Sequence, residues 1–184
     1  MKYINSIDKV ILDAEKVSLS GDDILNITDN KCKVMRYQDL EKYDNINQAL
    51  EPHGAIVLLY QHEADFGHWV AVFKVNDSTI EVFDSYGIPI DSEIEFSPFQ
   101  IRRHQGEKVA HLTHLIEQSP QYTKVLENKE PLQKDKRDVN TCGRFAAVRI
   151  RFRDVPLKKF DQMFRNTSCG NPDFTVSALT LLFS

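Results

Sequence analysis

The sequence predicts an α+β fold in which a small central sheet, mostly antiparallel, is flanked by helices. Short apolar stretches typical of strands cluster in the middle of the chain, and stretches with helical periodicity lie before and after them. The chain has 184 residues, of which 41% are hydrophobic, and it contains no repeat, linker or low-complexity tract. These observations predict a single domain over residues 1–184 that is long enough to bury a core.

The first elements are predicted from helical spacing and from one short apolar run. Residues 19–28 indicate a turn that leads into a short helix, and residues 32–37 favour a short strand. Residues 6–17 begin with Ser6, a residue type that caps helices. Their apolar side chains recur at helical intervals, at Ile7, Val10, Ile11, Ala14 and Val17.

The next segments lead into the predicted centre of the sheet. Residues 37–52 are predicted to form a helix or irregular helix that ends before Pro52, because the residue before a proline avoids the helical conformation. Residues 54–61 are a short continuous apolar run, as expected of a central strand. We therefore expect one buried strand to start directly after this helical region.

A β-hairpin is predicted to follow. Residues 68–75 and 79–87 have the composition of strands, and the Asn-Asp-Ser sequence of residues 76–78 between them consists of turn formers. The two strands are therefore expected to pair with each other in the antiparallel direction.

Loops and helices complete the chain. Residues 97–106 and most of residues 123–141 are polar and are predicted to be loops. Residues 107–118 place apolar side chains on one helical face, and residues 142–155 are predicted to be a helix or a buried segment. The remaining predicted helices cover residues 157–164 and 173–183.

Charge and cysteine content exclude several classes of protein. The net charge of −4 argues against a dedicated nucleic-acid binder, whose surface is usually basic. The cysteines are odd in number and widely spaced, which suits a reducing compartment better than a disulfide framework. The N-terminus lacks the apolar run of a signal peptide, and no stretch approaches the roughly 20 apolar residues of a membrane span. We therefore expect a soluble, intracellular protein without a membrane partner.

Cys142 is the candidate nucleophile, although cysteine is also among the residue types most often buried as small hydrophobes. A cysteine nucleophile needs a base, usually histidine, and the base needs a third group to orient it. All six histidines precede Cys142. A site at Cys142 therefore requires the histidine to come before the cysteine, and the opposite order is open only to Cys32.

His68 and Asp84 are the candidates for the base and the orienting group. His68 opens one strand of the predicted hairpin directly after Gly67, and Asp84 closes the other strand just before Gly87. In a hairpin the start of one strand lies beside the end of its partner, so the two side chains are expected to be neighbours. Taken singly, each residue also fits a purely structural interpretation, in which it only begins a strand or a turn.

The residues around Cys142 favour an anion-stabilising helix end. Cys142 precedes Gly143 and a predicted helix, and a helix N-terminus stabilises a thiolate. Backbone N–H groups at that end can also hold an oxyanion. Asn140 or Thr141 is expected to cap the helix. Gln133, which lies upstream, is the candidate for a further oxyanion donor.

The stretches GHWVAVF, IEVFDSYG, LQ and NTCGRF occur in this order between residues 54 and 153 and resemble the clan CE cysteine peptidases. This family includes adenain, which is the adenovirus maturation protease, the SUMO-specific proteases, and related proteases of large DNA viruses and virophages. The family usually places its glutamine closer to its cysteine, and residues 1–50 and the chain beyond residue 155 match no family motif. The family pattern falls on His68-Trp69, Asp84, Gln133 and Cys142-Gly143.

The resemblance implies a papain-like core in the circular order of adenain and the SUMO proteases, and a cysteine endopeptidase that needs no cofactor. It implies that Cys142 attacks the scissile carbonyl, that His68 is the general base and that Asp84 orients the imidazole. Gln133 and the Cys142 backbone N–H would hold the oxyanion.

The resemblance also implies cleavage after small, glycine-containing motifs. Trp69 follows the base, and an indole there would narrow the adjoining groove, with Gly143 as a second substrate contact. Because side chains alternate along a strand, the alternative is that Trp69 points into the core.

The small size and the NTCGR sequence favour the viral branch of the family. The implied substrates are viral capsid or core precursor proteins, processed during particle maturation in the host cytoplasm or the virion, with DNA or a peptide as an activator. Three alternatives remain open: a deubiquitinating or deSUMOylating protease, an acyltransferase that modifies Lys or Ser, and a non-catalytic binding module.

Three other features of the sequence have simple explanations. Residues 61–68 contain two histidines and two acidic residues but no HExxH motif, so no metal site is expected. Cys169 precedes Gly170 and, shortly after, Pro172, and is expected to lie in a turn. An excess of basic side chains is expected to form a solvated face, and a docking patch for DNA or a capsid protein is the alternative. These side chains are Arg144, Arg149, Arg151, Arg153, Lys158, Lys159 and Arg165, opposed by Asp154 and Asp161.

Overall fold

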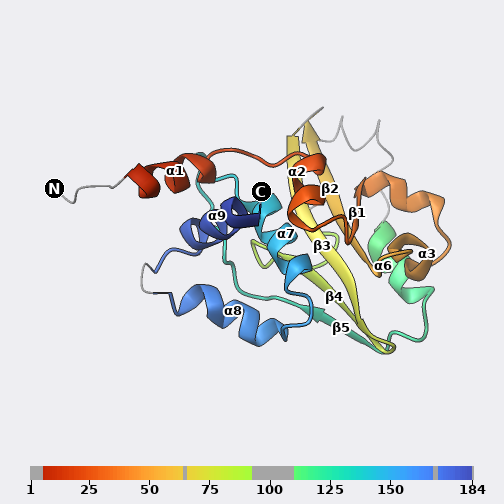
Figure 1. The fold of residues 1–184 in the computed structure, drawn as a ribbon. Coiled ribbons are helices and arrows are strands. Elements are labelled where there is room, and N and C mark those ends of the chain that lie inside the picture. Colours follow the sequence, from red (N-terminus) through yellow and green to blue (C-terminus); the bar gives the residue numbers. More distant parts are fainter. Residues whose placement is uncertain (1–5, 64–65, 93–109, 168–169, 184) are drawn as a thin grey trace.

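The computed structural model describes residues 6–63, 66–92, 110–167 and 170–183. Within them, five strands form one sheet in the order β1-β2-β3-β4-β5 (Figure 1). The α+β class predicted from the sequence is confirmed. The strands are β1 (Lys33–Arg36), β2 (Ala55–Glu63), β3 (Phe66–Asn76), β4 (Thr79–Asp84) and β5 (Lys124–Glu127).

The sheet is mixed, whereas a mostly antiparallel sheet was expected. Strand β3 pairs antiparallel with β2 and with β4, as the predicted hairpin requires. The outer pairs, β1 with β2 and β4 with β5, are parallel. Parallel neighbours need a crossover connection, and here helical segments lie between the strands of each outer pair.

Residues 123–141 are mostly loop, as predicted, except for strand β5. It is short, it is an edge strand, and its residues are half-buried or exposed. A polar edge strand carries little apolar periodicity, so the sequence pattern did not reveal it.

The predicted helices are present, with the boundaries of several shifted by a few residues. Ser20 caps α2 through a capping box with Asp23, which explains where that helix begins. The helices are α1 (Ser6–Glu15), α2 (Gly21–Ile27), the 3₁₀ helix η1 (Tyr37–Lys42), α3 (Ile46–Leu50), α6 (His111–Glu117), α7 (Cys142–Arg151), α8 (Leu157–Arg165) and α9 (Pro172–Phe183).

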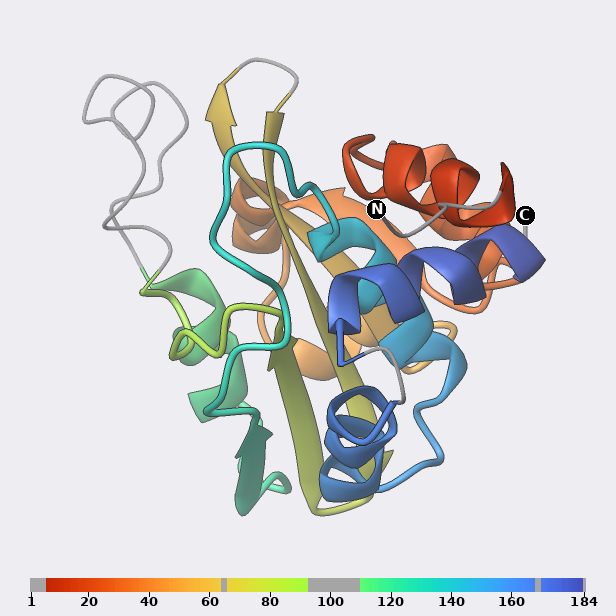
Figure 2. The same ribbon diagram turned by 90° about the vertical axis from the view of Figure 1, so that its left-hand side faces the viewer.

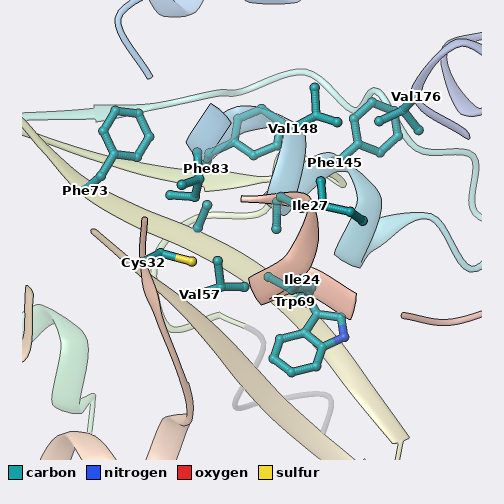
Figure 3. Packing of buried hydrophobic residues seen from close by; sticks show 14 of the residues in the cluster. Ile24, Ile27, Cys32, Val57, Trp69, Phe73, Phe83, Phe145, Val148 and Val176 are labelled. Carbon is teal, nitrogen blue, oxygen red and sulfur yellow. The ribbon is translucent and has the colours of Figure 1, made fainter. Parts of the chain in front are cut away.

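Both faces of the sheet are covered. Helices α1, α2, α7, α8 and α9 lie on one side, and α3 and α6 lie on the other (Figures 1 and 2). Alternate residues of β3 enter the two cores. Trp69 and Phe73 lie in the core that also contains residues of α2 and α7 (Figure 3), and Val70 belongs to the core on the opposite face. Helix α7 thus lies directly against the strand that carries His68.

Two basic side chains of the predicted solvated face are buried, which corrects that part of the interpretation. Arg149 is 1% exposed and forms an ion pair with Glu81 on β4. Arg144 is 5% exposed and donates to the Thr180 hydroxyl and the Ala14 carbonyl oxygen. Both arginines lie on α7 and join it to neighbouring elements, so neither contributes to a solvated docking patch.

Only some of the apolar side chains that predicted helix α1 are buried. Ile11 is buried, but Ile7 and Val10 are 67% and 57% exposed. The predicted loop at 97–106 and the predicted turn at Cys169 lie outside the described residues, as does Val109 at the start of the predicted helix 107–118. None of the helices in the described ranges has the length and apolar character that crossing a bilayer requires.

Candidate active site

The hairpin brings His68 and Asp84 together as the sequence predicted. Asp84 is paired with Val70 across the β3–β4 ladder, so His68 is the next residue along β3 that points to the same face. The His68 Nε2 and Asp84 Oδ2 atoms are 2.9 Å apart. Each residue is only 4% exposed, so the pair is held in a buried environment.

Gly67 is required where the β2–β3 pairing becomes irregular, just before His68. A Cβ atom at this position would lie 2.1 Å from the carbonyl oxygen of Tyr60 and 2.9 Å from the Cα atom of Gln61. Both obstacles are backbone atoms and have no freedom to move aside. Only glycine therefore lets β3 approach β2 closely at the residue that precedes the imidazole.

Hydrogen bonds to both carboxylate oxygens and to the backbone fix the position of Asp84. Its Oδ2 atom faces His68, and its Oδ1 atom accepts the Tyr86 backbone N–H at 2.7 Å. The Asn128 side chain accepts the Asp84 backbone N–H at 2.9 Å and donates to the Asp84 carbonyl oxygen. Asn128 follows the last residue of β5, and its amide continues the β4–β5 ladder by one step. Sequence reasoning missed Asn128 because it lies in a polar stretch without periodicity.

The surroundings of His68 favour its charged form. Burial disfavours the imidazolium, but the Asp84 carboxylate, with a further contribution from Cys142, outweighs burial and raises the pKa of His68 well above its ordinary value. The Tyr86 ring stacks on the imidazole, with the ring centroids 5.0 Å apart and the planes inclined by 27°. The Tyr86 ring therefore restricts the orientation of the imidazole, and the Asp84 carboxylate stabilises its positive charge.

Cys142 is the first residue of α7 and is half-buried. The Cys142 thiol is near enough to the His68 imidazole to contribute to the raised pKa of His68. Since Nε2 of His68 faces Asp84, Nδ1 is the nitrogen left for a partner on the other side of the ring. The buried carboxylate–imidazole pair and the thiol at the start of α7 are therefore neighbours in space.

Gln133 is buried near the C-terminal end of β4, where Asp84 lies. Its Oε1 atom accepts the Ser85 hydroxyl at 2.7 Å, and its backbone N–H donates to the Ser85 carbonyl oxygen. Its Nε2 atom donates to the Val139 carbonyl oxygen at 3.2 Å. The contacts to Ser85, the residue after Asp84, tie the loop that carries Gln133 to β4 despite the long spacing from Cys142.

The two residues before Cys142 do not cap α7 in the predicted way. Thr141 occupies the N-cap position but makes no side-chain cap bond, because its hydroxyl donates to Asp173 of α9 at 2.6 Å. The backbone N–H of Asn140 donates to the Glu15 carbonyl oxygen, and its side chain donates to that of Lys16. The N-terminal segment, which matched no motif, thus holds the chain beside the candidate nucleophile.

Trp69 and Gly143 pack against each other. Trp69 is 8% exposed, lies in the core between the sheet and α7, and donates its indole N–H to the Leu19 carbonyl oxygen (Figure 3). A Cβ atom at Gly143 would lie 3.0 Å from Cδ1 of Trp69. Trp69 therefore points into the core, which was the alternative to a role in narrowing the groove, and the substrate contact expected of Gly143 remains a prediction.

The arrangement has the parts that nucleophilic catalysis by cysteine requires. An imidazole held by a carboxylate can take the thiol proton and keep the resulting charge paired. The free N–H groups at a helix N-terminus can stabilise negative charge on sulfur or on an attacked carbonyl oxygen. Among the described residues, no group of three or more metal-ligating side chains is assembled.

Comparison with known proteins gives one relative. "Uncharacterized protein V9" of Sputnik virophage is 33% identical to the chain over 171 residues, which cover 91% of the chain and 96% of the relative. No family model matches the chain. The likeness extends over residues at both ends that matched no motif in the sequence.

Proposed function

The chain belongs to the same family as the Sputnik virophage protein "Uncharacterized protein V9", and we propose that it is a cysteine endopeptidase of the clan CE, adenain-like type. The observation that carries this proposal is the buried His68–Asp84 pair, which lies near the Cys142 thiol at the start of α7. A relative from a virophage accords with the viral branch of that clan.

In the proposed reaction Cys142 reacts as a thiolate beside the His68 imidazolium. The sulfur attacks the scissile carbonyl carbon and forms a tetrahedral intermediate with a negatively charged oxygen. The His68 imidazolium donates its proton to the leaving amine, and the C–N bond breaks to leave a thioester on Cys142. Neutral His68 then takes a proton from water, the hydroxide attacks the thioester, and the thiolate leaves beside the regenerated imidazolium.

The supporting groups have distinct roles in this proposal. Asp84 keeps Nε2 of the imidazole occupied, so Nδ1 stays directed to the thiol, and its charge stabilises the imidazolium. The Cys142 backbone N–H and the Gln133 side-chain amide hold the oxyanion. The Ser85 hydroxyl, which binds Oε1 of Gln133, orients that amide.

The proposed substrates are viral capsid or core precursor proteins, cut after small, glycine-containing sequences. Because Trp69 lies in the core, it does not narrow a groove, and the expected preference for glycine rests on the family resemblance alone. DNA or a peptide remains the proposed activator. No cofactor takes part in the reaction.

We expect a library of peptides that vary in the two residues before the cut to be cleaved chiefly after glycine. The library is incubated with the purified protein and with Cys142→Ala, and the products are identified by mass spectrometry. Equally efficient cleavage after Leu, Phe or Lys would contradict the preference for glycine. If no peptide is cut, and viral precursor proteins are also left intact in the presence of DNA, the peptidase proposal fails. Cleavage restricted to ubiquitin-like fusions would instead favour a deubiquitinating type of enzyme.

A further inference from the structure

The loop between Gln133 and Cys142 has both of its ends attached to one carboxylate. The backbone N–H of Lys134, the residue after Gln133, donates to Oδ2 of Asp173 at 3.2 Å. The hydroxyl of Thr141, the residue before Cys142, donates to Oδ1 of the same carboxylate at 2.6 Å. Asp173 lies in the first turn of α9, so a helix remote in sequence bridges the two ends of this loop.

This bridge is buried, although it is polar. Asp173 and Thr141 are both 0% exposed. Burial raises the pKa of Asp173, against the donation from Thr141 and Lys134, and the carboxyl end of Glu15 lies nearby with its own pKa raised by burial and by Asp173. A carboxylate in such a place is costly unless its oxygens are bonded, and each oxygen of Asp173 has one of the two loop ends as its donor. The fold therefore stabilises this buried carboxylate through its hydrogen bonds to the two ends of the loop.

The rest of the loop has weaker support. Residues 134–138 are exposed to solvent, and the other attachments include the Lys134 ammonium to the Asn171 side-chain oxygen, the Gln133 amide to the Val139 carbonyl oxygen, and Asn140 to the α1 end. Thr141 gives up its ordinary capping bond to α7 in order to bind Asp173. The position of the first turn of α7, and with it the direction of the Cys142 side chain, thus depends on α9.

We propose that Asp173 is a positioning residue for the nucleophile, which sets the place of Cys142 relative to His68 and Gln133 by bonding Thr141 and Lys134. The proposal rests on the peptidase function for its effect on turnover, but not for its effect on the thiol. A small displacement of a reacting group is enough to slow a reaction by about a hundredfold. Loss of either bond should therefore lower kcat and leave KM little changed.

Two nearly isosteric variants break the bridge. Asp173→Leu removes both acceptor oxygens, and Thr141→Val removes the hydroxyl donor. We expect each to lower kcat about 10- to 100-fold, and Thr141→Ser, which restores the hydroxyl, to recover most of the rate. The matched control is Thr28→Val, since Thr28 is 1% exposed and its hydroxyl bonds the Ile24 carbonyl oxygen in α2. That variant should lose stability but keep its rate.

The second readout is the rate at which iodoacetamide alkylates Cys142 at pH 6, measured on folded protein by peptide mapping. It needs no substrate, so it tests the positioning even if the protein cleaves no peptide. Slower alkylation in Asp173→Leu and Thr141→Val, recovery in Thr141→Ser and no change in Thr28→Val support the proposal. If the two variants are alkylated and turn over at the wild-type rates, or if Thr141→Ser loses as much as Thr141→Val, the bridge only stabilises the fold. Either result would overturn the proposal that Asp173 positions the nucleophile. If the wild-type protein cleaves no substrate but the variants still differ in their alkylation rates as expected, only the peptidase function is overturned.

Discussion

Replacing Cys142 with alanine is expected to abolish peptidase activity and to leave the fold intact. Removal of the nucleophile leaves no group to form the thioester, and the loss in a peptidase of this kind is at least about 10⁴-fold in kcat. The thiol is only half-buried, so its loss removes little packing. Cleavage of the best library peptide and urea unfolding would be measured on the same preparation.

Cys32 offers the matched control for this substitution. It is 2% exposed, lies in the core beside the Thr28 hydroxyl, and takes no part in the chain of contacts around His68. Cys32→Ala should therefore lower stability and keep peptidase activity, which is the reverse of the pattern expected at Cys142. An active Cys142→Ala protein would remove Cys142 as the nucleophile.

Replacing Arg149 with methionine is expected to destabilise the fold by about 3–5 kcal/mol, because it leaves the Glu81 carboxylate buried without its partner. Arg149 Nε and Nη2 lie 2.6 and 3.0 Å from the two Glu81 oxygens, and both side chains are 1% exposed. The guanidinium also donates to the carbonyl oxygens of Phe152 and Val155, where the chain leaves α7. The free energy of unfolding in urea would measure the loss.

Two further variants separate the buried charge from general damage. Arg165→Met breaks the exposed pair with Asp161 and should cost under about 1 kcal/mol. The double variant Glu81→Leu with Arg149→Met removes the unpaired charge and should recover part of the lost stability, limited by the carbonyl groups of Phe152 and Val155. If the single variant unfolds like wild type, the ion pair does not join α7 to the sheet energetically. If the double variant recovers nothing, the cost lies in packing.

The hairpin and its two site residues were predictable because they follow from local pattern. Alternating apolar residues, turn formers at 76–78 and the ends of two short strands place His68 near Asp84 without any long-range information. The helix that begins at Cys142 was predictable for the same reason. Which neighbours complete the site depends on how distant segments pack, and sequence patterns do not carry that information.

Asn128, Asp173 and Arg149 illustrate what was missed. Asn128 lies in a polar stretch that resembles a loop, yet its side chain extends a parallel ladder to Asp84. Asp173 looks like an ordinary acidic residue of a first helical turn, and Arg149 like part of a basic face. Each is buried by tertiary packing alone. The parallel pairing of β4 with β5 was missed for the same reason, since β5 is too polar to appear as a strand.

The central claim is that His68 activates Cys142, and the most direct test is the pH dependence of Cys142 alkylation in wild type and in His68→Gln. Because the pKa of His68 is raised well above its ordinary value, the imidazolium persists at pH values where an ordinary histidine is neutral. The wild-type thiol should then react rapidly at pH 6 and gain little at higher pH. Without the imidazolium, an ordinary thiol gains about tenfold in thiolate for each pH unit below about 8.5. Slow alkylation at pH 6 that rises steeply with pH is therefore expected in His68→Gln, and identical profiles in the two proteins would contradict the account.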